Sequence, residues 1–326
     1  MYFAIVMTNA NQLVLPTAEG VARAAAKIAE ILPPTPLLPV EHEGRKFWLK
    51  AECLQPIGAF KIRGGWNRLS DLSAEERALG VVAVSSGNHA QGVAWAARRL
   101  DIAATIVMPS DAPAIKVNRT RELGAQIVFY DRMTENREEI ALAIVMKTGA
   151  ILVHAFADRW VIEGQGSAGI EIAHQLGHQP SRILACCGGG GLSAGLALAC
   201  PDAEVIPVEP EGWDDVCRSL EAGAIQSVRP NPPPTACDAL QTLATAEINF
   251  AVLKERCVSG LRVSEEEVRH AQRFAAGELR LVLEPGGAVA LAAALAGKVE
   301  VDGNTVVIAT GGNTDLQAIA AVLQDK

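Results

Sequence analysis

The sequence lacks several features that would place it in a specialised class of protein. No apolar run reaches the roughly 18 residues expected of a membrane-spanning helix. The apolar start of the chain, residues 1–6, has no basic segment before it and does not resemble a signal peptide. The 326 residues carry a net charge of −8, which argues against nucleic acids and anionic membranes as main partners. We therefore expect a cytoplasmic, soluble protein that binds a small molecule.

The cysteines also lack the spacing of a structural framework. There are seven of them, an odd number, and none forms a paired C-x-x-C pattern. Neither a disulfide framework nor a zinc site is indicated, and the thiols are typical of a reducing compartment. They are Cys53, Cys186, Cys187, Cys200, Cys217, Cys237 and Cys257.

Short runs rich in Val and Ile alternate with longer segments of helical period, which predicts an α/β fold with parallel strands. The predicted strands are residues 47–50, 81–84, 104–108, 126–130, 151–154, 183–186, 204–208 and 305–308. The predicted helices include residues 87–100, 114–123, 135–148, 163–176, 265–279 and 288–296.

The length corresponds to about two domains at roughly 150 residues each. The run from Val81 to His154 holds about four strand and helix pairs, enough for a compact unit of its own. We predict a small domain, residues 78–154, inserted into a large domain made of residues 1–77 and 155–326. Residues 229–235 contain four prolines and are predicted to form a loop, because proline removes backbone donors.

Four consecutive glycines, Gly188, Gly189, Gly190 and Gly191, follow one predicted strand and precede a helix-prone segment. A run without side chains at a helix N-terminus presents backbone N–H groups that suit a phosphate. The run does not continue as a dinucleotide fingerprint or as a P-loop, so we expect a lone phosphate group.

Two further segments combine polar side chains with glycine. Lys61 lies beside Phe60 and between glycines, where partial desolvation would lower its pKa and allow a Schiff base; alone, it also fits a surface lysine at a helix start. Residues 85–89, Ser-Ser-Gly-Asn-His, follow a strand and begin a helix. They could receive a carboxylate or simply cap the helix.

Acidic and hydroxyl side chains follow two other strands. Glu209, Asp214 and Asp215 could hold Mg²⁺ or Ca²⁺, and an acidic helix N-terminus explains the two aspartates equally well. Thr310 comes after the strand at residues 305–308, at the carboxyl edge where α/β proteins bind ligands.

In this order the motifs resemble the fold-type II pyridoxal 5′-phosphate enzymes, and among them the serine/threonine dehydratase and serine racemase family. The resemblance extends from Thr35 to Asn313. The segment around Lys61 looks like the family's S-F-K-I-R-G, with Ala59 in place of the usual serine. One departure is Ala239, which stands where the family has the glycine of A-D-G and puts the shape of the substrate pocket in question.

The resemblance implies two open, twisted sheets with helices on both faces, as in the tryptophan synthase β-subunit. It also implies roles for individual residues. Lys61 would carry the cofactor, Phe60 would pack beside its ring, and Asn88 would bond its phenolic oxygen. The remaining cofactor ligands would be Gly188, Gly189, Gly190 and Gly191 for the phosphate and Thr310 for the pyridine nitrogen.

The substrate and metal ligands are implied in the same way. Ser85, Ser86, Gly87, Asn88 and His89 would hold the substrate carboxylate. Glu209 and Asp215, with the carbonyl of Trp213, coincide with the divalent-cation site of the metal-dependent members, which would take Mg²⁺, Mn²⁺ or Ca²⁺. The family also implies a homodimer.

The expected activity is elimination from L-threonine or L-serine to give a 2-oxo acid and ammonia. A hydroxyl at Thr310 would leave the pyridine ring largely neutral, which favours loss of a β-substituent over transamination. Serine racemisation is an alternative, with Ser86 as the acid on the opposite face, and so is elimination from 3-hydroxyaspartate. From another class, a non-catalytic phosphate or nucleotide binder stays open.

Overall fold

Helices and strands alternate along most of the chain. The computed structural model describes residues 14–112 and 114–324. Its strands are β1 (Leu37–His42), β2 (Arg45–Lys50), β3 (Val81–Val84), β4 (Ala104–Pro109), β5 (Gln126–Tyr130), β6 (Ile151–Leu152), β7 (Arg182–Cys186), β8 (Glu204–Pro210), β9 (Leu261–Val263) and β10 (Thr305–Ile308).

The helices follow the strands in most places. They are α2 (Ala18–Ala29), α3 (Lys61–Ser70), α4 (Ala74–Leu79), α5 (Asn88–Leu100), α6 (Ala114–Glu122), α7 (Arg137–Thr148), α8 (Arg159–Leu176), α9 (Gly191–Ala199), α10 (Asp215–Ala222), α11 (Glu247–Arg256), α12 (Glu265–Phe274), α13 (Pro285–Leu295) and α14 (Leu316–Gln324). Short helical turns are η1 (Glu52–Leu54), η2 (Asp238–Leu240) and η3 (Ala275–Leu279).

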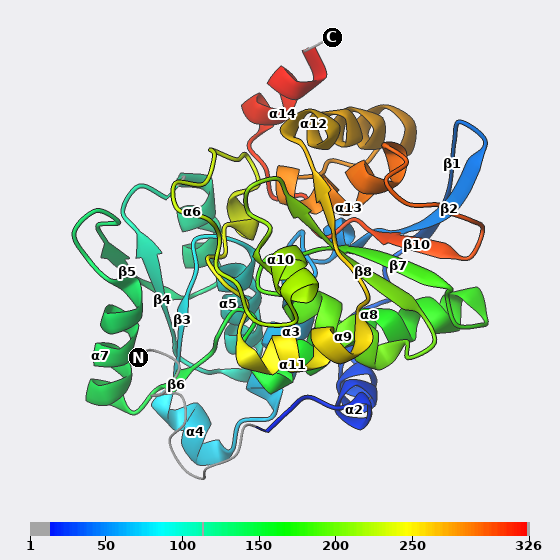
Figure 1. The fold of residues 1–326 in the computed structure, drawn as a ribbon. Helices are drawn as coiled ribbons and strands as arrows, with labels where there is room; N and C mark the ends of the chain where they lie inside the picture. The colour runs from blue at the N-terminus through cyan, green and yellow to red at the C-terminus, as the bar shows by residue number, and fades with distance from the viewer. Residues whose placement is uncertain (1–13, 113, 325–326) are drawn as a thin grey trace.

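The strands form two separate sheets (Figure 1). The larger has the order β1-β2-β10-β7-β8-β9 and is parallel except for the antiparallel hairpin of β1 and β2. The smaller has the order β5-β4-β3-β6 and is parallel throughout. The α/β fold with two open sheets, predicted from the sequence, is confirmed.

Helices cover both faces of the larger sheet, which explains why its central strands β7 and β10 are mostly apolar. Along β7, Leu184 packs into a core with α12 and α13, whereas Ile183 and Ala185 pack into a core with α8 and α9. In the smaller sheet, Val81 packs with α3 and α5, and Val82 packs with α7.

The strands of the smaller sheet all come from residues 81–152, and the larger sheet takes strands from both sides of that range. This is the arrangement that an inserted small domain requires. The domain limits at residues 78 and 154 stay a prediction.

Some boundaries differ from the predicted ones for identifiable reasons. The sequence analysis did not predict β1 and β9, which are edge strands; β1 contains Pro39, and β9 has three residues. The strand predicted for residues 151–154 ends at Leu152. The helix predicted for residues 265–279 ends at Phe274 and continues as a π-type turn. Residues 223–237 contain no helix or strand, so the loop predicted at the proline-rich segment is confirmed.

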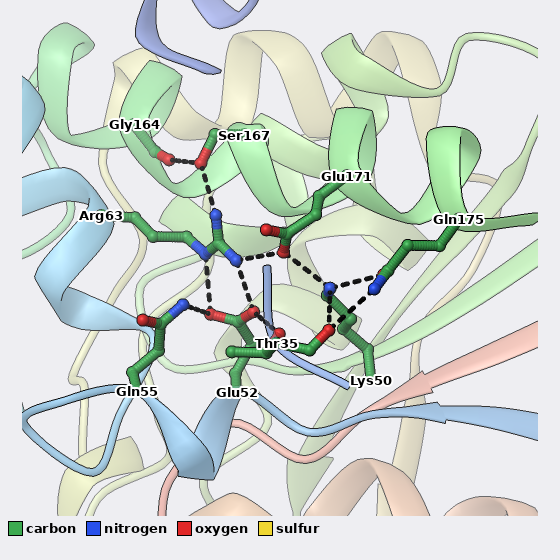
Figure 2. A network of polar contacts seen from close by, with 9 residues as sticks. All are labelled: Thr35, Lys50, Glu52, Gln55, Arg63, Gly164, Ser167, Glu171 and Gln175. Atoms are coloured by element: carbon green, nitrogen blue, oxygen red, sulfur yellow. Dashed lines mark hydrogen bonds and ion pairs between the residues drawn. The ribbon is translucent and has the colours of Figure 1, made fainter. Parts of the chain in front are cut away.

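A buried network of charges fixes the start of α3 (Figure 2). Arg63 is 1% exposed and donates to both carboxylate oxygens of Glu52 at 2.7 Å. It also donates to Ser167 at 3.1 Å and to Glu171 on α8. Lys50 at the end of β2 lies 2.6 Å from the same Glu171. The network therefore joins α3 to the larger sheet and to α8.

The negative charges of Glu52 and Glu171 are compensated by the positive charges of Arg63 and Lys50. Burial alone would raise the pKa of Glu52, but Arg63 and Lys50 hold it at about 2. The Glu52 carboxylate receives a further hydrogen bond from the Thr35 hydroxyl at 2.7 Å. A buried charge with this many partners becomes costly as soon as one partner is removed.

We therefore expect Glu52→Gln to lower the free energy of unfolding by about 3–5 kcal/mol, because Arg63 would keep its charge without a full counter-charge. Urea unfolding measures this value. The control is Asp111→Asn, which breaks the exposed pair with Arg132 and should cost less than about 1 kcal/mol. Equal losses in the two variants would contradict the importance of the buried network.

Within residues 14–112 and 114–324, no helix combines the length and apolar character needed to cross a bilayer.

Candidate active site

A pocket collects almost every site residue that the sequence analysis singled out. Its lining includes Phe60 and Lys61, residues 85–89, residues 188–191 and Thr310. These segments are far apart in sequence and meet where α3, the start of α5, the start of α9 and the end of β10 converge. The three predicted metal ligands, Glu209, Trp213 and Asp215, are not part of its lining.

Lys61 is the first residue of α3 and projects into this pocket. Its Nζ donates to the Ala155 carbonyl at 2.7 Å and lies 5.2 Å from the centre of the Phe60 ring. Burial lowers the pKa of Lys61 to about 8. A substantial fraction of the amine is therefore neutral near pH 8, as a nucleophile or general base requires.

Helix α3 can lie this deep because it carries glycine where it meets α5. A Cβ atom on Gly65 would lie 2.7 Å from the Gly92 carbonyl oxygen, and one on Gly92 would lie equally close to the Lys61 carbonyl oxygen. No side chain fits at either position. The two glycines bring the lysine and the start of α5 onto closely packed helices.

The tetraglycine loop is a cradle that side chains would fill. A Cβ on Gly189 would overlap the Phe156 ring, and Gly190 has φ +85°, which favours glycine. Within the described residues, none of the amides of 188–191 donates a hydrogen bond to another protein group. Free amides at the N-terminus of α9 can donate to a phosphate, so this loop suits the phosphate group of pyridoxal phosphate.

In the loop at residues 85–89, the side chains of Ser85 and His89 form hydrogen bonds with the protein backbone. The Ser85 hydroxyl accepts the Gly87 N–H at 3.1 Å. His89 donates from Nε2 to the Val153 carbonyl at 3.0 Å, since a carbonyl can only accept. Burial, with Lys61 adding to it, lowers the pKa of His89 to about 3, so the ring is neutral. His89 thus offers no cation to a carboxylate, and any help from the loop comes from backbone N–H groups and hydroxyls.

Asn88 is held by groups on both sides. Its Nδ2 donates to Glu284, and its Oδ1 accepts from Asn313 Nδ2 at 2.8 Å. Asn313 in turn accepts from Arg119 at 2.6 Å. One N–H of Asn88 is left for a ligand, because the amide has two and one goes to Glu284. A ring oxygen of the cofactor is a suitable acceptor.

Thr310 lies two residues beyond β10, and its carbonyl accepts the Phe60 N–H at 3.0 Å. This bond ties the segment that precedes Lys61 to the end of β10. Thr310 is 3% exposed and lines the pocket. Its contact with the cofactor ring stays a prediction.

The sequence analysis missed several pocket residues. Glu284 is a buried carboxyl whose pKa burial raises to about 7. Lys116 on α6 pairs across the pocket with Asp238 on η2. Phe156 and Thr242 lie against the tetraglycine loop. Only Glu284 left a local signal, since it precedes Pro285 and two glycines at the start of α13.

The predicted metal ligands lie away from the pocket. Glu209 accepts the backbone N–H groups of Val216 at 3.1 Å and Cys217 at 2.7 Å. Asp215 is fully buried, and neither carboxylate oxygen has a partner in the described part of the chain. Burial raises the pKa of both carboxyls, to about 7 for Asp215.

These residues do not form a complete protein-only metal cluster. Residues 14–112 and 114–324 contain no group of three or more His, Cys, Asp or Glu side chains able to hold a metal ion. The two buried carboxylates are hard oxygen donors, and Arg218 offsets the effect of burial on Asp215 only in part. They suit Mg²⁺ or Ca²⁺ if carbonyls or water complete the shell.

Comparison with known proteins identifies the family of this chain. A family model described as pyridoxal-phosphate dependent enzyme matches residues 28–311. The chain belongs to this family. The match confirms the resemblance read from the motifs around Lys61 and the tetraglycine loop.

Individual relatives of this family member have different activities. The chain is 38% identical over 323 residues to an L-threo-3-hydroxyaspartate ammonia-lyase of Saccharomyces cerevisiae, covering 96% of this chain and 98% of the relative. It is 40% identical over 288 residues to an L-threonine ammonia-lyase of Thermotoga maritima, covering 87% and 71%. The structure of maize serine racemase matches with a TM-score of 0.89 and 32% identity, covering 95% and 98%. Lyases and racemases thus share this fold.

Glu284 makes the stability of the cofactor-free protein depend on pH. Its pKa is 4.5 when unperturbed and about 7 in the fold, through burial and the nearby Asp238, against the Asn88 hydrogen bond and Lys116. A raised pKa means that the stabilisation is complete below pH 4.5 and is lost as the pH rises towards 7. We expect a loss on the order of 3 kcal/mol across this range.

Denaturant unfolding of the cofactor-free protein at several pH values tests this expectation. Glu284→Gln should lack this part of the pH dependence, so the stability difference between wild type and variant should shrink or reverse as the pH rises. Glu255→Gln, at a residue whose side chain is 73% exposed, is the control. A constant difference between wild type and Glu284→Gln would contradict the assignment.

Proposed function

We propose that the chain is a pyridoxal-phosphate dependent ammonia-lyase that converts L-serine or L-threonine to a 2-oxo acid and ammonia. The observation that carries the proposal is the position of Lys61. A buried lysine whose pKa lies near 8 faces the same pocket as a side-chain-free phosphate cradle. The names of the relatives support the reaction class, because ammonia-lyases and racemases are among them.

In this proposal the pocket residues divide the work of holding the cofactor. Residues 188–191 would bind the phosphate with backbone N–H groups. Asn88 would donate to the ring oxygen, and the Thr310 hydroxyl would donate to the pyridine nitrogen. Phe60 packs against the ring. When bound, pyridoxal phosphate supplies an electron-accepting ring that lowers the cost of negative charge at the substrate Cα.

The chain's own groups then move the protons. The substrate carboxylate lies on residues 85–89, at the N-terminus of α5. The neutral Lys61 amine removes the Cα proton, and the ammonium group so formed gives a proton to the β-hydroxyl, which leaves as water. The released enamine is hydrolysed to the 2-oxo acid and ammonia. Ser86 lies in the same loop and could return a proton from the other face, which would give racemisation as a side activity.

The test starts from the visible absorbance of the purified protein and from 2-oxo acid release with L-serine, L-threonine and DL-threo-3-hydroxyaspartate. We expect an absorbance band from the lysine-bound cofactor and turnover of serine or threonine. Lys61→Ala should lose the band and at least about 10³-fold of the activity. Lys46→Ala is the control, because the Lys46 side chain is 69% exposed on β2.

The outcomes separate the two classes of function. A protein that binds the cofactor and releases no 2-oxo acid or D-amino acid from any of these substrates would favour a non-catalytic binder. A colourless protein that pyridoxal phosphate cannot reconstitute would contradict the proposed function as a whole.

A second candidate substrate is 3-hydroxyaspartate, which has an additional carboxylate. The observation that favours it is a pair of cations in the pocket lining, Lys116 and Arg137. The Lys116 side chain is 13% exposed and now pairs with Asp238, so a substrate carboxylate could take the place of that partner. This candidate predicts that Lys116→Gln lowers kcat/KM for hydroxyaspartate by about tenfold or more and leaves serine nearly unchanged. An equal loss for both substrates would contradict it.

We also propose that a divalent cation binds at Glu209 and Asp215, with the Trp213 carbonyl as a further ligand. The partnerless oxygens of Asp215 support this site. Mg²⁺, Mn²⁺ or Ca²⁺ should raise the Tm of the EDTA-treated protein, because binding to the folded state alone stabilises it. Asp215→Asn should abolish the rise. Asp214→Asn, which removes a partner of Arg262, should keep it. A rise that survives in Asp215→Asn would contradict the site.

Two broader expectations remain part of the proposal. The chain would act as a homodimer in the cytoplasm on small amino acids. All seven cysteines are free and buried, as suits a reducing compartment.

A further inference from the structure

A thiol and a hydroxyl meet in the lining of the pocket. Cys186 is the last residue of β7, and its Sγ is 3.0 Å from Thr310 Oγ1. Both side chains are buried, at 5% and 3% exposure, and both line the pocket. The mechanism above uses Thr310 and gives Cys186 no role.

The contact can be made in two directions, and they have different consequences for the pocket. If the Thr310 hydroxyl donated to sulfur, it would present only lone pairs to the ring nitrogen, which is itself an acceptor when the ring is neutral. If the Cys186 thiol donates to the Thr310 oxygen, the single hydroxyl proton stays available for the pocket.

The chemistry of the two groups favours the second direction. Burial raises the pKa of Cys186 to about 11, so the sulfur carries its proton and can donate. Oxygen is also a better acceptor than sulfur. The charged groups that act on this thiol are Glu284 and Lys61, which line the same pocket, and their effects on its pKa oppose each other.

The backbone of Thr310 does not compete for this task. Its N–H is directed to the Gly287 carbonyl and its carbonyl accepts from Phe60. The hydroxyl is therefore the polar group of Thr310 that remains for a ligand.

We infer that Cys186 is a positioning residue, whose thiol donates to Thr310 Oγ1 and so points the Thr310 hydroxyl proton at the pyridine nitrogen of the cofactor. The inference rests on the proposed function, in which Thr310 meets that nitrogen. A hydrogen bond received by an O–H group strengthens the bond that the same group donates. Cys186 thus acts on the cofactor through Thr310, without touching the substrate.

The test uses three variants of the full chain. Cys186→Ala removes the donor, and Cys186→Ser replaces it with another donor of similar size. Cys200→Ala removes a buried thiol directly after α9 that bonds the Gly169 carbonyl at 3.5 Å, outside the pocket. The Tm of each variant shows whether it folds.

The first readout is the Kd of pyridoxal phosphate for the cofactor-free protein, by fluorescence titration, together with the visible spectrum of the reconstituted protein. We expect Cys186→Ala to weaken binding about fivefold to tenfold and to shift the band, and Cys186→Ser and Cys200→Ala to stay within about twofold of wild type. If Cys186→Ser is as weak as Cys186→Ala, the side chain acts by packing and the inference is wrong.

The second readout is the S–H stretching band in the infrared difference spectrum between wild type and Cys186→Ala. It should report a donated hydrogen bond that strengthens when pyridoxal phosphate is added. A band typical of a free thiol, or one that the cofactor does not change, would overturn the inference. If the wild type does not bind pyridoxal phosphate at all, the proposed function fails instead, and the two failures are distinguishable.

Discussion

The buried pairing of Arg63 with Glu52 is the constraint on which the rest of the site depends. Arg63 lies two residues after Lys61 on α3, so whatever fixes the guanidinium also fixes the start of that helix. A bidentate contact leaves little freedom to the arginine, because both donors must stay in the plane of the carboxylate. Glu171 and Lys50 extend this contact to α8 and β2. The Lys61 amine is thus held in place by charges that the pocket itself does not contain.

The remaining parts of the pocket are arranged around that fixed point. The Phe60 amide bonds to Thr310, which joins the segment before Lys61 to the end of β10. The Ala155 carbonyl holds the amine, and the next residue, Phe156, fills the space over Gly189. Thr310 and the tetraglycine loop are therefore each connected to Lys61 through the residues next to it in the chain or in contact with it. An arrangement of this kind favours preorganisation, in which the protein needs little rearrangement when its ligand binds.

Local sequence was enough to find the residues that act through a motif. Lys61 and the four glycines stand in short segments whose composition has a direct chemical meaning. The apolar runs of β7 and β10 placed the glycines and Thr310 at strand ends. Lys116 and Asp238 could not be found in this way, because their pairing joins elements that are far apart in sequence. Glu284 left only a weak local signal, and its importance comes from burial and from its contact with Asn88. The sequence analysis missed the edge strand β1 because Pro39 weakens the strand signal of that segment. Its strand conformation comes from pairing with β2.

The order of strands in the larger sheet has a consequence for the synthesis of the protein. β10 lies between β2 and β7, with Val306 opposite both Trp48 and Ile183. While the ribosome is still making residues 300–310, these two strands have no neighbour on their facing edges, and Thr310 does not yet exist. Contacts between such distant segments form late. The nascent chain must therefore keep two apolar strand edges from aggregating until its last strand arrives, and the cofactor can find its complete site only after that.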